Sequence, residues 1–239
     1  SPAEYMQRAA PLLSLRLPKI IFMPSQYMDI CRDAAHAGST TLVPFEMEDL
    51  DREMPMDTAW ALPTDHAIDH DTHKYMQIIL QKTGWMCRAA EMVPEPARTH
   101  FLWVDLGLIH VFPQRDARMF QAAVHAAATG AAGLDRAKVR IAGIWPLPTG
   151  FAYTEMWAHA QQRVLWYLAG GVFGGCGPAL RAFESEVQEE LERVRSHKRW
   201  MWEVNVWALV LARKPELFDV YHGSHNASIL LNYANPSQK

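Results

Sequence analysis

The sequence predicts an α/β protein with a mostly parallel central sheet flanked by helices. Short apolar runs and helical segments alternate along a chain of 239 residues, which is the pattern of folds with a parallel sheet and crossover helices. The clearest strand, residues 101–105, is apolar without interruption up to its last residue, as expected for a strand covered on both faces. The length suits one unit, so we expect a single domain over residues 1–239.

The composition excludes several classes of protein. Apolar residues make up 49% and charged residues 21% of the chain, which is close to the globular average and unlike a disordered tail, a collagen-like fibre or a coiled-coil rod. A net charge of -3 argues against a general nucleic-acid-binding protein. No apolar run reaches the roughly 18–20 residues that span a bilayer, and no signal-peptide pattern opens the chain. We therefore expect a cytoplasmic protein without a transmembrane segment, whose three widely spaced cysteines are free thiols.

The first half of the chain reads as helix, strand, helix, strand, loop and helix. Prolines bound the apolar run of residues 19–23, and β-branched residues favour a strand at 40–45. Pro94 ends a long amphipathic pattern. The predicted elements are a helix at 4–13, a strand at 19–23, a helix at 25–36, a strand at 40–45, a loop at 52–72 and one helix at 73–92.

The second half continues the alternation. Gly130 ends an alanine-rich helix, and a glycine-rich stretch after residue 169 predicts a turn. The predicted elements are a strand at 101–105, a helix at 115–129, strands at 139–144 and 165–169, helices at 178–197 and 200–213, a strand at 217–221 and a polar C-terminal stretch at 226–239 that ends in a frayed tail.

Asp105 is the first candidate for chemistry. It ends the apolar strand that carries Trp103, and Gly107 follows it closely. Ligands of open α/β sheets gather at the carboxyl ends of the strands, and a glycine lets a ligand approach the backbone. A carboxylate there predicts a contact to a metal or a ribose, with simple capping of the next segment as the alternative.

Two further segments combine polar groups with unusual surroundings. Residues 170–175 hold four glycines, Gly170, Gly171, Gly174 and Gly175, around Val172 and Phe173. Such a segment allows close backbone approach to a ligand, although it matches neither standard phosphate-loop spacing and could be a plain flexible turn.

The other segment, residues 200–207, places one carboxylate and one amide, Glu203 and Asn205, among three tryptophans. Aromatic walls around a carboxyl are common in sugar sites. A core helix with one charge facing solvent is the alternative.

Histidines provide the remaining candidates. His222 follows the last strand and could be a metal ligand. The segment from Asp65 to His73 also contains His66, His70 and several aspartates, so a metal-dependent hydrolase could use it. Its spacing matches no established metal motif, and a polar loop that caps the following helix, with Asp71 or Thr72 as N-cap, is the alternative.

Taken in order, these segments resemble the HtrL/YibB family of bacterial glycosyltransferase-like proteins. The resemblance covers nearly the whole chain and is most specific at residues 101–107, which are similar to a W-x-D-x-G strand end in that family. The helix with Tyr75 and Lys82, the glycine-rich segment 168–175, Trp202-Glu203 and the loop at His222 follow in the order of the family.

The resemblance implies a GT-A-type fold and a glycosyltransferase that moves a sugar from a nucleotide-sugar donor, helped by Mn²⁺ or Mg²⁺. The acceptor would be a bacterial surface glycan, a lipid-linked or protein acceptor, and the enzyme would be cytoplasmic or peripheral to the inner membrane. Asp105 and Glu203 would be catalytic, Asp105 and His222 would bind the metal, and Glu203 would be the acceptor-side base. The implied donor-binding residues are Trp103, Gly107, Gly170, Gly171, Phe173, Gly174, Gly175, Asn205 and Lys82.

The resemblance also predicts a first nucleotide-binding strand before the start of this sequence. Two other functions remain open from the residues. One is a metal-dependent hydrolase built on residues 65–73, and the other is a non-catalytic protein that binds a nucleotide or a carbohydrate.

Overall fold

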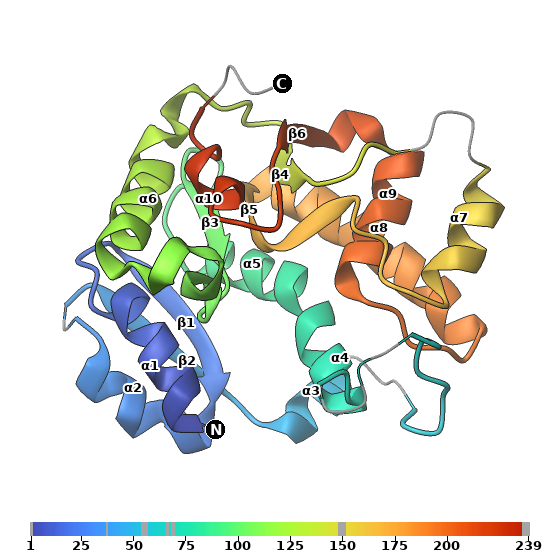
Figure 1. Ribbon diagram of the computed structural model, residues 1–239, viewed down its shortest axis with the longest axis horizontal. Coiled ribbons are helices and arrows are strands. Elements are labelled where there is room, and N and C mark those ends of the chain that lie inside the picture. Colours follow the sequence, from blue (N-terminus) through green and yellow to red (C-terminus); the bar gives the residue numbers. More distant parts are fainter. Residues whose placement is uncertain are drawn as a thin grey trace.

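The computed structural model describes residues 2–36, 38–53, 57–65, 67, 70–147 and 152–235. These residues form an α/β fold with two sheets and helices packed against them (Figure 1), which confirms the predicted class. In the smaller sheet, β1 (Lys19–Pro24) and β2 (Thr40–Phe45) pair in parallel. Both strands lie where the sequence predicts them.

The larger sheet has four strands in the order β3-β5-β4-β6. These strands are β3 (His100–Val104), β4 (Val139–Gly143), β5 (Leu168–Cys176) and β6 (Phe218–His222). β4 and β6 are parallel, but β5 runs antiparallel to both of its neighbours. This sheet is therefore mixed rather than mostly parallel. Apolar patterns report which strand faces are covered but carry no information on strand direction.

The glycine-rich segment is a correction to the sequence analysis. Residues 170–175 lie within β5 and form its central part, whereas a turn was predicted. Neighbouring elements approach so closely that side chains do not fit. A Cβ at Gly174 would lie 2.3 Å from the carbonyl oxygen of Phe101, and one at Gly171 would lie 2.8 Å from Leu108. The glycines thus permit tight packing on the strand.

The helix predicted at 73–92 is two helices. α4 (His73–Leu80) and α5 (Lys82–Glu91) meet at Gln81, which ends one helix and begins the other. The Thr72 hydroxyl accepts a hydrogen bond from the Tyr75 N–H at 3.2 Å, so Thr72 caps α4, as one alternative predicted. The break places Lys82 in the first turn of α5.

The other predicted helices are present with shifted ends. α1 (Pro2–Leu13) and α2 (Met28–Ala34) accompany the small sheet, and α6 (Ala117–Thr129), α8 (Gly177–Ser196) and α9 (Glu203–Arg213) accompany the large one. Residues 200–202 precede α9, which begins later than predicted. The sequence analysis missed α3 (Met47–Glu53) and α7 (Tyr153–Ala160).

The C-terminal stretch contributes to the core, which its polar sequence did not predict. It forms α10 (Ser228–Leu231) and buries Ile229, Leu230 and Tyr233, whereas the predicted frayed end lies outside the described residues. The buried Arg140 guanidinium holds this stretch, because its Nε donates to the Tyr233 carbonyl at 2.6 Å and its Nη2 donates to the Asn235 carbonyl at 2.8 Å.

Two apolar clusters cover the faces of the large sheet. One joins α8 and α9 to the face that carries Phe173 and Ile141. The other joins α6 and α10 to the face that carries Val172 and Tyr221. Within the described residues, no helix is long and apolar enough to cross a bilayer. The three cysteines are free thiols, as predicted.

Candidate functional site

A buried lysine connects β3, β5 and α9 at one edge of the large sheet. The Lys82 side chain is 7% exposed. Its Nζ lies 3.0 Å from Oε1 of Glu203 and 3.1 Å from the Asp105 carboxylate. It also donates to the Gly170 carbonyl at 3.0 Å. Three acceptors match the three N–H donors of an ammonium group, so Lys82 is fully bonded within the protein.

Asp105 is the exposed member of this group. It follows the last residue of β3, and its backbone N–H donates to the Gly171 carbonyl at 2.9 Å. The indole Nε1 of Trp103 donates to Oδ1 at 2.7 Å, while Lys82 binds the carboxylate from the buried side. The side chain remains 37% exposed. Asp105 is therefore a fixed carboxylate that still has surface to offer a ligand.

Glu203 lies behind the lysine at the first position of α9. Its side chain is 8% exposed. A Cβ at Gly170 would lie only 2.4 Å from Glu203 Oε1, so the carboxylate occupies the space that this glycine leaves free. Together these contacts direct the Glu203 carboxylate toward Lys82 rather than toward solvent.

The charges of the cluster keep the lysine protonated. Burial lowers the pKa of Lys82, but Asp105 and Glu203 outweigh that effect and raise the pKa above its ordinary value. One ammonium with two carboxylates leaves the cluster with an excess of one negative charge, and that charge reaches solvent at Asp105.

Two tyrosines flank the cluster. Each residue keeps about half of its surface exposed, at 52% for Tyr5 and 43% for Tyr75. Loss of water around each hydroxyl raises the pKa of Tyr5 and of Tyr75 to about 12, and the nearby charge of Asp105 or Glu203, respectively, adds to it. Both hydroxyls are therefore neutral at physiological pH and can donate hydrogen bonds beside the carboxylates.

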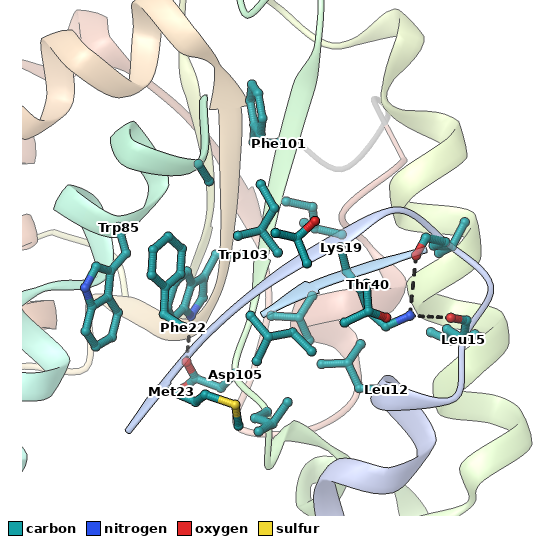
Figure 2. Close-up of a pocket in the computed structure, with 18 of the residues that line it drawn as sticks. Leu12, Leu15, Lys19, Phe22, Met23, Thr40, Trp85, Phe101, Trp103 and Asp105 are labelled. Atoms are coloured by element: carbon teal, nitrogen blue, oxygen red, sulfur yellow. Dashed lines mark hydrogen bonds between the residues drawn. The ribbon is translucent and has the colours of Figure 1, made fainter. Parts of the chain in front are cut away.

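A cavity of about 1740 Å³ opens beside the cluster, between β1 and β3. Its walls include Lys82 and Asp105, both flanking tyrosines and the rings of Phe22, Trp85 and Trp103. Figure 2 shows Trp85, Phe22 and Trp103 in sequence across this cavity with Asp105 below them. Glu203 does not line it.

Several predicted donor-binding residues lie elsewhere. Phe173 is fully buried and packs against Trp207, with ring centroids 4.8 Å apart. Asn205 is fully buried, and its amide donates to the carbonyls of Ala160 and Arg163 and accepts from the Leu165 N–H. These two side chains hold the core and the loop before β5.

The remaining predicted residues divide between the site and the packing of β5. Gly107 lies at the mouth of the cavity, where the Tyr5 ring is 3.6 Å from the position of a Cβ. Gly170 and Gly171 touch the cluster through their backbones. Gly174 and Gly175 face Phe101, Tyr233 and Lys138 further along β5.

The predicted metal ligands do not converge. Asp105 follows β3 and His222 ends β6, and two strands separate β3 from β6. At the usual interstrand spacing this is about 14 Å, whereas two ligands of one Mn²⁺ or Mg²⁺ each lie within about 2.2 Å of the ion. The Lys82 ammonium moreover fills the space between Asp105 and Glu203. The donor set therefore does not fit a divalent cation held by Asp105 and His222.

The segment at residues 65–73 gives no metal site in the part of the chain that is described. The ring of His73 lies 3.2 Å from the Trp60 carbonyl, and Asp71 accepts a hydrogen bond from the Ala67 N–H. His66 and Asp69 lie outside the described residues. Among the residues that the structure covers, no three His, Cys, Asp or Glu side chains are grouped to hold a metal ion.

The bridging position of Lys82 was not recognised in the sequence, although the residue was named. A signal was present: Lys82 lies on the apolar stripe of its helix, with Ile79 and Met86. Lysine is almost never fully buried unless it is paired, so its place on that stripe indicates buried acceptors. Which carboxylates accept from it could not be read from the spacing.

Comparisons with known proteins add little to this geometry. No protein-family model matches the chain, and no curated protein sequence matches it. Among solved structures, the apo form of mouse xyloside xylosyltransferase 1 is similar at a TM-score of 0.46 and 10% sequence identity, over 90% of this chain and 79% of that chain. This degree of similarity assigns neither an activity nor a site, and the resemblance to the HtrL/YibB family stays a prediction.

Proposed function

We propose that this protein is a glycosyltransferase that binds a nucleotide-sugar donor beside Asp105, at the mouth of the cavity. The observation that carries the proposal is the fixed, exposed Asp105 carboxylate at the mouth of a cavity with aromatic walls. Its oxygens are oriented by Trp103 and Lys82, so they can accept hydrogen bonds from the hydroxyls of a sugar or ribose. The half-exposed side chains of Tyr5 and Tyr75 beside it offer apolar faces to a base or to a sugar ring.

In this proposal the residues around Asp105 have distinct roles. Asp105 contacts the donor, and Tyr5 and Tyr75 provide neutral hydroxyl donors next to it. Lys82 and Glu203 are positioning residues, because both act through the orientation of Asp105. The resemblance implied Glu203 as a base, but a buried carboxylate paired with an ammonium is poorly placed to take a proton from an acceptor.

The proposal includes the acceptor class and the location that the resemblance implies. The acceptor would be a surface glycan, a lipid-linked acceptor or a protein, and the enzyme would act in the cytoplasm or at the inner membrane. We propose donor binding without a divalent cation, because Lys82 already supplies the cation that faces Asp105.

The test is a thermal-shift screen with UDP-, GDP-, CMP- and dTDP-sugars. A ligand that binds the native state raises the apparent Tm, so the donor that raises it identifies the base. The Asp105→Asn variant should lose the shift, while Asp33→Asn, at an exposed aspartate of α2 away from the cavity, should keep it. Absence of a shift with every donor, or an unchanged shift in Asp105→Asn, would contradict the proposal.

One observation favours a second function, a binding protein without turnover. Glu203 is the second carboxylate of the cluster, and its pairing with Lys82 leaves it without exposed surface toward the cavity. Release of the nucleotide from the donor that binds, a nucleoside diphosphate or, for a CMP-sugar, CMP, would distinguish the two functions. Binding without release, with candidate acceptor sugars present, would favour the binding protein.

A further inference from the structure

Two strands present open edges to the same cavity. Among the residues that the structure describes, β1 pairs only with β2 and β3 pairs only with β5, so each is an outer strand of its sheet. Every residue of β1 and of β3 lines the cavity, and Figure 2 shows β1 crossing the view near β3 with side chains of both around it. Open strand edges are usually paired, covered or blunted in native proteins.

β1 and β3 have their helix-covered faces on the same side of the molecule. On β1, Met23 belongs to the apolar cluster beneath α1 and α2, and Phe22 points to the opposite face against Trp85. On β3, Val104 packs on the cluster of α6, and Trp103 packs with Trp85. α1 and α6 are in contact, so the two sheets have their covered faces on the same sides.

One ring contacts side chains of both edge strands. Phe22 of β1 and Trp103 of β3 both stack on Trp85 of α5, with centroid distances of 5.5 and 6.2 Å and interplanar angles of 5° and 17°. Trp85 thus packs against both strands on the face opposite α1 and α6.

The two edges also run in the same direction. Leu106, just after β3, packs into the cluster that contains Met23, near the end of β1. The carboxyl ends of both strands therefore lie together. Strand alternation turns every second N–H to one side. Because the N–H of Lys19 faces β2 and that of Asp105 faces β5, the N–H groups of Ile20 and Phe22, and of Leu102 and Val104, face the cavity.

The start of α1 indicates what fills the gap. The Tyr5 ring lies 3.6 Å from the Cβ position of Gly107, and α1 contacts residues 108–111, so α1 starts at the carboxyl end of β3. From there α1 returns to the beginning of β1. A helix that starts at the carboxyl ends of parallel strands and returns to the next strand is the second part of a βαβ unit.

We infer that the cavity is the seat of one further parallel strand, formed by residues that lead directly into α1 in the same polypeptide. This strand would join the two sheets into one. Its side chains would alternate between the α1–α6 face and the Trp85 face, and its carboxyl end would lie next to Asp105. The inference rests on the strand edges. Because the strand would fill the space between β1 and β3, the donor of the proposed function would bind at its carboxyl end, beside Asp105, Tyr5 and Tyr75.

The test is amide hydrogen exchange on the natural full-length protein, read residue by residue. The N–H groups of Ile20, Phe22, Leu102 and Val104 should exchange as slowly as those of Ile21 and Trp103, which already face β2 and β5. In the chain of residues 1–239 alone, the first four should exchange about 100-fold faster, while Ile21 and Trp103 serve as matched controls.

Three results would overturn the inference. The first is fast exchange of the four edge amides in the full-length protein. The second is slow exchange that appears only as protein concentration rises, because a second copy then covers the edges. The third is a natural chain with too few residues before α1 to form a strand of about five residues.

Discussion

Lys82 Nζ and Glu203 Oε1 lie 3.0 Å apart, although 121 residues separate them in the sequence. Both side chains are almost entirely buried. The pair ties the first turn of α5 to the first turn of α9, and the same ammonium binds Asp105. The Lys82 ammonium therefore orients Asp105, the carboxylate proposed to bind the ligand, and also contributes to the stability of the fold.

Removing the ammonium should destabilise the protein strongly. Lys82→Met leaves Glu203 buried without a partner, and such a loss costs about 3–5 kcal/mol. Urea unfolding measures the free energy directly. Lys82→Met combined with Glu203→Gln should recover part of the loss, because the unpaired charge is gone. Lys74→Met, at an exposed lysine of α4, is the control. A loss below 1 kcal/mol in Lys82→Met would contradict the pairing.

A methyl group at Gly170 should disturb the same pair. Its carbon would lie 2.4 Å from Glu203 Oε1 and 3.0 Å from Val204, so Gly170→Ala should cost about 1–3 kcal/mol through overpacking. Gly133→Ala meets no atom within 4 Å and should leave the free energy of unfolding nearly unchanged. Equal unfolding midpoints for the two variants would show that Glu203 does not occupy this space.

The stability of the fold should fall in mild acid because of His100. Burial, together with the charge of Arg140, lowers the pKa of His100 to about 4, against about 6.5 in the unfolded chain. Between these values the unfolded state binds a proton that the folded state does not, so the free energy of unfolding decreases as pH falls from 6.5 to 4. The contribution is on the order of 3 kcal/mol.

Urea unfolding at pH 7, 5.5 and 4.5 measures this dependence. His100→Gln should flatten it relative to the natural protein. His125→Gln, at an exposed histidine of α6, should retain it. If the free energy of unfolding varied with pH equally in all three proteins, His100 would not be the cause of the dependence.

Asn205 should act on stability and leave ligand binding unchanged. Its amide makes three hydrogen bonds to the backbone of residues 160–165, and Asn205→Ala would leave those buried groups without partners, at a cost of about 1–3 kcal/mol for each group that water does not reach. Faster hydrogen exchange at residues 160–165 should accompany the loss. A variant that folds normally but no longer binds the donor would instead place Asn205 in the donor site.

Divalent cations should have little effect on donor binding. Because Lys82 fills the space between the two carboxylates, the thermal shift caused by the nucleotide-sugar should be equal in EDTA and in Mn²⁺. Calorimetric titration of Mn²⁺ into the protein without donor checks the same point. A donor shift that requires Mn²⁺ would show that a cation displaces the ammonium or binds Asp105 from solvent.

The sequence predicted most elements because burial patterns are local. The proline-bounded run of β1 and the alanine-rich α6, closed by Gly130, required no tertiary information. The glycines of β5 misled the prediction, because a turn and a crowded strand both select for glycine. The split at Gln81 was also invisible, since helical spacing continues through it.

The sequence by itself determined the α/β class, the strand that ends at Asp105 and the unusual placement of a lysine on an apolar helical stripe. These features follow from local periodicity and from the cost of burying a charge. Only the tertiary structure decided that Lys82 bridges Asp105 and Glu203, that His222 lies three strand spacings from Asp105, and that β1 and β3 face each other across a cavity. Strand order and direction depend on contacts between distant segments, and residue spacing along the chain does not record them.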